Sequence, residues 1–257
     1  MTVMINAARK AARGIQRDFG EVENLQVSRK GPGDFVTSAD RRTEQILHDE
    51  LAKARPGYGF LGEESGETPG SDPDHRWVID PIDGTTNFIH GLPLVAISMA
   101  LERKGEPIAG LIYNPIMDEL FTAEKGRGAF LNERRRLRVS AREELTDALV
   151  SCGLPHRTGD TARLYCRELE ILIGKVAGLR RTGSACLDLA FVAAGRFDAF
   201  WERGLHPWDL AAGILLIREA GGRTGDIDGI DDPLKTGSIL ATNSHLHAAL
   251  EKCLRSA

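Results

Sequence analysis

The sequence predicts a mixed α/β fold in which sheets and helices alternate within one compact body. Three patterns favour this class: apolar residues at helical spacing near the N-terminus, short apolar runs in the middle, and strands mixed with helices in the second half. A chain of 257 residues can form one large domain or two closely fused halves. We expect a single domain over residues 1–257, with a loose subdivision into 1–145 and 146–257.

Two helices are expected first. Apolar residues recur at roughly helical spacing over residues 3–15, and Gly20 can end this helix. Thr37 or Ser38 can cap a second helix, which must end before Pro56.

Short strands should follow. Residues 58–62 and 76–79 are apolar runs typical of strands, and the polar segment 65–75 between them is expected to be a loop. From Leu94 to about Val139, apolar runs alternate with turn signals, which predicts a meander of antiparallel strands. The strands of this meander are expected at 95–101, 108–113, 119–123 and 128–131.

The second half mixes the two kinds of element. Strands are expected at 148–152, 198–201 and 238–241. Helices are expected near 161–174, at 184–194, from Pro207 to Gly221, and from Ser244 onward.

Composition excludes several classes of function. The net charge of -4, from 33 basic and 37 acidic residues, is too small to indicate nucleic-acid or membrane binding, so a small-molecule partner is favoured. Four cysteines without CxxC spacing indicate reduced thiols and a cytoplasmic protein. Charged residues interrupt the first 20 positions, which disfavours a signal peptide, and no run of about 18 apolar residues predicts a membrane span.

The segment Asp80-Pro81-Ile82-Asp83-Gly84 is the first candidate site. Pro81 favours extended backbone at Asp80 and Gly84 permits a turn, so the two carboxylates can converge on one cation. Magnesium prefers such hard oxygen ligands, including a backbone carbonyl such as that of Ile82. An ordinary acidic turn is also compatible with this stretch alone.

Three further segments bear on this choice. Thr85 and Thr86 would open a short helix whose first amides can bind an anion. Glu63 follows the strand at 58–62, although glutamates in such places are usually only solvated. Asp209 lies in the first turn of a helix that Pro207 starts, where an acid can simply complement the helix dipole.

Together these segments resemble the inositol monophosphatase family of magnesium-dependent, lithium-sensitive phosphatases. The likeness extends from Asp34 to Asn243, and residues 181–185 and 187–190 resemble the bacterial members of the family in particular. Its motifs are Gly62-Glu63-Glu64-Ser65, Asp80-Pro81-Ile82-Asp83-Gly84-Thr85-Thr86-Asn87-Phe88, Trp208-Asp209-Leu210-Ala211-Ala212-Gly213 and Glu219-Ala220-Gly221-Gly222. The resemblance implies a layered α-β-α-β-α sandwich and a homodimer.

The resemblance also implies two to three Mg²⁺ ions. Glu63, Asp80 and the Ile82 carbonyl would hold the first ion. Asp80, Asp83 and Asp209 would hold the second, and a third would share Glu63.

The remaining implied roles concern the phosphate, the water and the alcohol. The amides of Gly84 and Thr85 would bind the phosphate, while Asp40, the Thr85 hydroxyl and Glu63 would serve catalysis by orienting the attacking water and its metal. The alcohol of the substrate would meet four residues: Ser184, Ala185, Glu202 and Asp209.

The expected function is Mg²⁺-dependent hydrolysis of myo-inositol monophosphate, or a related sugar phosphate, by metal-activated water. The Thr86-Asn87-Phe88 ending favours the inositol branch. One alternative is a broad-specificity fructose-1,6-bisphosphatase and inositol phosphatase. Another is a non-catalytic partner of the transcription machinery that contacts RNA polymerase, for which Arg180 and Arg181 would matter most.

Overall fold

A computed structural model describes residues 1–19, 27–31, 34–154, 160–229 and 232–257. The helices are α1 (Thr2–Asp18), α2 (Ser38–Ala54), α3 (Thr85–Ile89), α4 (Asp160–Ile173), α5 (Ala185–Ala193), α6 (Pro207–Glu219), α7 (Pro233–Thr236) and α8 (His247–Arg255), with a 3-10 turn η2 at Leu145–Asp147. The strands of the first half are β1 (Val27–Gly31), β2 (Asp34–Thr37), β3 (Tyr58–Gly62), β4 (Gly66–Thr68), β5 (Asp72–Asp83), β6 (Ala96–Arg103), β7 (Glu106–Asn114), β8 (Glu119–Glu124), β9 (Gly128–Leu131) and β10 (Arg135–Arg136). Those of the second half are β11 (Leu149–Cys152), β12 (Gly178–Arg180), β13 (Ala199–Glu202), β14 (Arg223–Gly225) and β15 (Ile239–Thr242).

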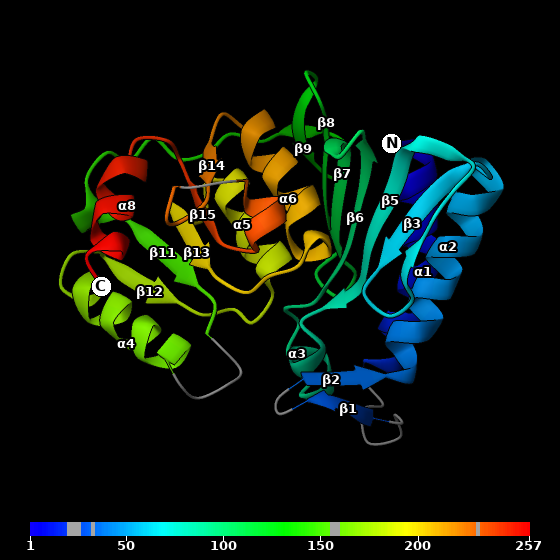
Figure 1. Cartoon of the computed structure of the whole chain (residues 1–257), viewed down its shortest axis with the longest axis horizontal. Coiled ribbons are helices and arrows are strands. Elements are labelled where there is room, and N and C mark those ends of the chain that lie inside the picture. The colour runs from blue at the N-terminus through cyan, green and yellow to red at the C-terminus, as the bar shows by residue number, and fades with distance from the viewer. Residues whose placement is uncertain (20–26, 32–33, 155–159, 230–231) are drawn as a thin grey trace.

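Five layers lie on one another (Figure 1). Helices α1 and α2 cover one face of an eight-stranded sheet, and α5 and α6 lie between its other face and a five-stranded sheet. Helices α4 and α8 cover the far face of the second sheet. The α-β-α-β-α sandwich expected from the sequence is confirmed.

The eight-stranded sheet has the order β10-β9-β8-β7-β6-β5-β3-β4. Strands β5 to β10 pair antiparallel in chain order, which confirms the predicted meander, while β3 lies parallel to β5. The predicted loop at 65–75 was wrong, because β4 and the start of β5 lie within it. Both pieces are polar, and their residues are exposed or half-buried near the sheet edge, so they lack the apolar alternation that identifies a buried strand.

The five-stranded sheet has the order β12-β11-β13-β15-β14. Its three central strands are the three that the sequence predicts, within one or two residues. The two outer strands, β12 and β14, have three residues each, and all of these are exposed or half-buried. Strands so short at a sheet edge carry no periodic signal.

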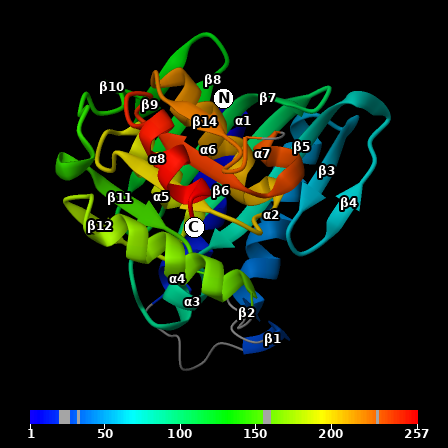
Figure 2. The ribbon, with the colours of Figure 1, turned by 60° about the vertical axis from the view of Figure 1, so that its left-hand side comes forward.

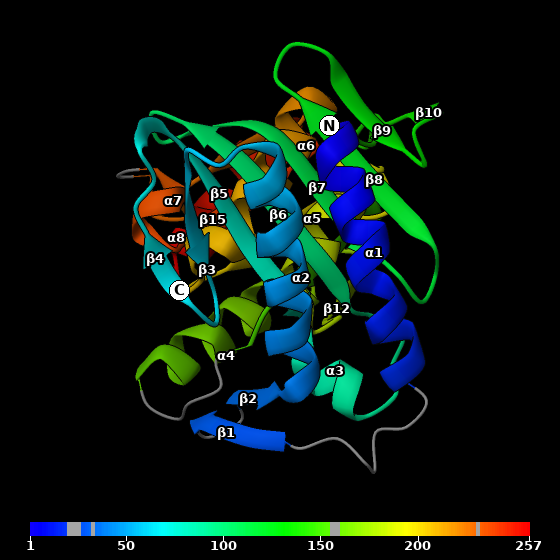
Figure 3. The same ribbon diagram turned by 90° about the vertical axis from the view of Figure 1, so that its right-hand side faces the viewer.

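Packing explains the character of the helices. Every residue of α5 is buried, because this helix is enclosed between the two sheets, and it therefore has no polar face. Helix α1 instead buries only the face that carries Met4, Ala8 and Ile15 against the outer side of the first sheet (Figure 3). Helices α4 and α8 lie side by side on the outside of the second sheet (Figure 2).

All four cysteines are free thiols. None of the helices in the described ranges has both the length and the apolar composition that a membrane crossing requires.

Candidate active site

Asp80 and Asp83 end the long strand β5. In a regular strand, residues three apart point to opposite faces. Here Asp80 pairs with Ser98 and Asp83 with Ala96, so three steps on β5 oppose two on β6 and one extra residue is bulged. The bulge restores a common side, and one carboxylate oxygen of each aspartate lies within 4.8 Å of the other and of the Cys186 sulfur.

The N-terminus of α5 holds Asp83 in place. Its Oδ2 accepts hydrogen bonds from the Ser184 hydroxyl, at 2.6 Å, and from the Cys186 amide, at 2.7 Å. Ser184 is also the N-cap of α5 and accepts from the Leu187 amide. Ser184 is thus buried against a predicted metal ligand, and its predicted contact with substrate stays a prediction.

Glu63 and Asp209 reach the same place from other elements. Strand β3 is parallel to β5, and the Glu63 amide donates to the Ile79 carbonyl at 3.1 Å, so Glu63 leaves the sheet beside Asp80. Asp209 lies in the first turn of α6, where its Oδ2 accepts from the His206 amide at 2.7 Å. The four acids therefore belong to three separate parts of the chain, namely the end of β3, β5 and α6, which lie together only in the folded protein.

The pKa values of Asp80 and Asp83 are raised by burial and by neighbouring carboxylates. Burial raises the pKa of Asp80 well above its usual range, and the neighbouring carboxylates of Glu63, Asp83 and Asp209 raise it further. Burial and Asp209 raise the pKa of Asp83 to about 6, although the bonds from Ser184 and Cys186 oppose this shift. Carboxylates crowded in this way could bind a metal cation, which would relieve their repulsion.

Asp40 and Thr85 form a pair beside the acids. The Thr85 hydroxyl lies 3.2 Å from Asp40 Oδ1 and 3.1 Å from the Ile82 carbonyl, and it can donate to either oxygen. Asp40 is buried in the first turn of α2. The carboxylate and the hydroxyl that the family resemblance assigns to one water molecule are therefore in direct contact.

Gly84 connects β5 to α3 with a left-handed backbone, at φ 90°. A β-carbon there would lie 2.8 Å from the Leu94 carbonyl oxygen, so both the conformation and the space favour glycine. The chain can consequently reverse directly after Asp83 and place the first amides of α3 next to the acids.

Glu202 ends β13 on the side of the acid cluster. Burial raises its pKa well above the usual range, and Asp209, Asp188 and Asp83 raise it further, which places this carboxylate in the same electrostatic field. Ala185 is the first residue of α5, between the two groups that bind Asp83. Glu202 and Ala185 thus lie beside the acid cluster.

Three residues with a clear structural role were missed from the sequence. The Cys186 amide binds Asp83, as described. The Asn87 amide donates to the Leu94 and Thr182 carbonyls, at 2.8 and 2.9 Å, and joins α3 to the segment before α5. Glu44 accepts from the Glu64 amide at 3.0 Å and fixes the turn that carries Glu63. Its spacing of four residues from Asp40, on the same face of a helix, was a usable signal.

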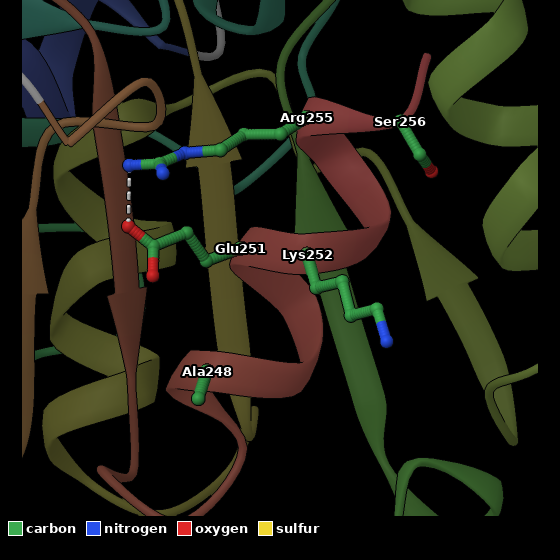
Figure 4. A pocket seen from close by; sticks show the side chains of 5 residues that line it. All are labelled: Ala248, Glu251, Lys252, Arg255 and Ser256. Carbon is green, nitrogen blue, oxygen red and sulfur yellow. Dashed lines mark hydrogen bonds and ion pairs between the residues drawn. The ribbon is translucent and has the colours of Figure 1, made fainter.

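A separate pocket of about 330 Å³ lies on the outer helix α8 (Figure 4). No residue of the acid cluster lines it. Arg255 and Glu251 form an ion pair at 2.8 Å in its wall. The lining residues belong to α8 and its C-cap: Ala248, Glu251, Lys252, Arg255 and Ser256.

Asp188, one turn into α5, is a further buried acid. Its pKa is raised to about 8, mainly by burial and further by the charge of Asp83. Hydrogen bonds from Thr182 and Ser151 and the charge of Arg181 oppose this rise. A carboxyl whose pKa is higher in the folded state binds a proton more tightly there. Its contribution to stability is therefore greatest below pH 4 and is lost progressively as the pH rises to about 8.

Replacement of this acid by its neutral isostere, Asp188→Asn, should remove that pH dependence. Between pH 6 and pH 8 the free energy of unfolding of the wild type should fall, relative to the variant, by up to about 1.4 kcal/mol per pH unit. Urea unfolding of both proteins across this range measures the difference. Parallel curves would show that Asp188 is ionised in the folded protein at neutral pH.

Comparisons with known proteins agree over the whole length of the chain. The family model described as "Inositol monophosphatase family" matches residues 1–257. A protein of Mesorhizobium japonicum named "Inositol-1-monophosphatase" is 57% identical over 255 residues, which are 99% of this chain and 96% of that protein. A "Nus factor SuhB" of Pseudomonas aeruginosa is 46% identical over 254 residues, 97% of this chain and 93% of its own. The crystal structure of extragenic suppressor protein suhB from Bartonella henselae superposes with a TM-score of 0.97 at 54% identity and covers 100% of this chain and 98% of its own.

Proposed function

The chain belongs to the inositol monophosphatase family and is a phosphatase, and we propose that it hydrolyses myo-inositol monophosphate, or a related sugar phosphate, with Mg²⁺. One observation carries the proposal. Asp80 and Asp83 on β5 lie beside the Asp40–Thr85 pair, and the carboxylates of Glu63, after β3, and Asp209, on α6, raise the pKa of Asp80.

The donor set fits Mg²⁺. All the proposed donors are hard oxygens, and the buried acids repel one another when no cation is bound. Glu63, Asp80 and the Ile82 carbonyl would hold one ion, Asp80, Asp83 and Asp209 a second, and a third would share Glu63. When bound, such ions lower the pKa of a water molecule and neutralise charge on the leaving oxygen.

The chain's own groups then position the reactants. Asp40 and the Thr85 hydroxyl orient the attacking water toward phosphorus, and the amides of Gly84 and Thr85 bind the phosphate oxygens. Ser184 and the Cys186 amide keep Asp83 in one orientation. Glu202, Asp209 and the wall formed by Ser184 and Ala185 receive the hydroxyl groups of the alcohol.

A phosphate-release panel tests the substrate. The purified enzyme with Mg²⁺ is offered myo-inositol 1-phosphate, fructose 1,6-bisphosphate, histidinol phosphate and a nucleotide 3'-phosphate at equal concentrations. The inositol ester should give the highest kcat/KM. Similar values for all four would replace this proposal by the broad-specificity alternative, and no release from any would refute it.

A second function is supported by the relatives named "Nus factor SuhB". The chain would then also act as a non-catalytic partner of the transcription machinery, through a surface that includes the exposed Arg180 and Arg181. A pull-down from lysate should recover RNA polymerase with the wild type and with Asp83→Asn, but less with Arg180→Ala. No recovery with the wild type would remove this function.

Three expectations remain: the reduced cysteines favour a cytoplasmic location, and the family resemblance implies a homodimer and inhibition by lithium. Sedimentation analysis tests the dimer directly, since a single species of 28.0 kDa would exclude it.

A further inference from the structure

We propose that Glu168 on α4 is a positioning residue, which holds Glu202 toward the substrate and thereby determines which alcohol the enzyme accepts. The inference rests on the proposed function, in which Glu202 contacts the hydroxyl groups of the substrate. It concerns a residue that the five-stranded sheet and the α5–α6 layer separate from the metal motif, on a helix that supplies none of the four acids.

Glu168 holds the residues on both sides of Glu202. Its Oε2 accepts from the Trp201 indole nitrogen at 3.0 Å, and its Oε1 accepts from the Arg203 guanidinium, with which it forms an ion pair. Glu168 is fully buried, and Arg203 retains only 15% of its side-chain exposure. A buried carboxylate bound by a cation and an indole has few other geometries open to it.

Strand geometry converts these two bonds into a constraint on Glu202. Side chains alternate between the faces of a strand, so Trp201 points to the α4 side and Glu202, the next residue of β13, points to the opposite side, where Asp209 and Asp83 raise its pKa. Arg203 follows the strand directly, and its bond to Glu168 turns it to the α4 side as well. Anchoring both neighbours on one face therefore fixes the direction of the residue between them. Glu202 is the last residue of β13, where pairing with the next strand ends.

Two further contacts complete this support. The Arg203 amide donates to the Tyr165 hydroxyl, also on α4, at 2.6 Å. On the other side, Gly153 follows β11, and a β-carbon there would overlap the carboxyl group of Glu202. Glycine thus leaves the space that this carboxyl occupies, and we call Gly153, Tyr165 and Glu168 the Glu202 seat.

The experiment compares two phosphate esters. Myo-inositol 1-phosphate has a polyhydroxylated alcohol, whereas p-nitrophenyl phosphate offers Glu202 no alcohol hydroxyl. Glu168→Gln should raise KM for the inositol ester, with a fall in kcat/KM of about tenfold, the size of one lost hydrogen bond to a charged group. Activity on the aryl ester should stay within about twofold of wild type. The matched control, Glu170→Gln, removes the same charge from an exposed position on the same helix and should change neither.

A double variant separates positioning from general damage. In a Glu202→Ala background, Glu168→Gln should produce no further loss of preference for the inositol ester. Both changes remove the same interaction, that of the Glu202 carboxylate with the hydroxyl groups of the substrate. If Glu168→Gln does not fold, Tyr165→Phe, which removes only a hydroxyl, should lower the same preference by a smaller factor.

The outcomes distinguish the two proposals. Suppose that Glu202→Ala lowers the preference for the inositol ester over the aryl ester, whereas Glu168→Gln and Tyr165→Phe leave it unchanged. This result would refute the positioning role of Glu168 and leave the proposed function standing. The positioning role would also be refuted if Glu168→Gln lowered this preference as much in the Glu202→Ala background as in the wild type. A wild type that hydrolyses only the aryl ester would overturn the proposed substrate and the seat with it.

Discussion

Mg²⁺ is expected to raise the melting temperature of the wild-type protein by about 5–10 °C and to leave that of Asp80→Asn almost unchanged. A ligand that binds only the folded state at a hundredfold excess over its Kd adds about 2.7 kcal/mol, which corresponds to such a shift for a chain of this size. Asp80 is buried, and its charge faces three other carboxylates. Its replacement removes a ligand of both proposed ions.

The same variant should be more stable than the wild type when metal is absent. Removing one of four crowded negative charges relieves repulsion that the folded state otherwise carries. Thermal unfolding in EDTA and in excess Mg²⁺ measures both effects. Asp147→Asn, the same chemical change at an exposed position, is the control and should respond as the wild type does. An equal Mg²⁺ response in Asp80→Asn would refute the metal assignment.

Thr85→Ala and Asp40→Asn are each expected to lower kcat by about 10²–10³, the usual contribution of a group that positions or deprotonates a nucleophile. The Thr85 hydroxyl contacts both Asp40 and the Ile82 carbonyl, so either change disrupts the proposed water site. Neither residue is among the proposed metal ligands. The Mg²⁺-dependent rise in melting temperature should therefore persist in both variants.

Steady-state kinetics of the double variant test whether the two residues act as a unit. The combined loss should be close to that of either single variant, because each change alone abolishes the arrangement. Thr86→Ala, one residue further along α3, is a matched control that should retain activity. A double variant whose loss equals the product of the two single losses would show that Asp40 and Thr85 act independently.

Much of the fold could be predicted because its central elements carry strong local signals. The meander and the three inner strands of the second sheet have apolar runs between clear turns. The edge strands β4, β12 and β14 could not be found, since three residues at an exposed edge show no alternation. Their position depends on the strands they join rather than on their own composition.

The site divides in the same way. Asp80 and Asp83 lie close together, and the charges of Glu63 and Asp209 act on Asp80, while the proposed type of ligand was inferred from the chemistry of carboxylates. The bulge that turns Asp80 and Asp83 to one side could not be read from the sequence, because it appears only in the pairing with β6. The roles of Cys186 and Asn87 were equally hidden, as their backbone and amide contacts join segments about a hundred residues apart.

The most direct test is a Mg²⁺ titration of phosphate release from myo-inositol 1-phosphate by Asp209→Asn. Asparagine can still accept the hydrogen bond from the His206 amide, so α6 should keep its cap while the cluster loses a charge. If Asp209 is a ligand of the metal site, the Mg²⁺ concentration for half-maximal activity should rise at least about tenfold, and the maximal rate should fall. A tenfold rise corresponds to a loss of about 1.4 kcal/mol in the binding free energy of Mg²⁺. An activation curve identical to that of the wild type would contradict the account.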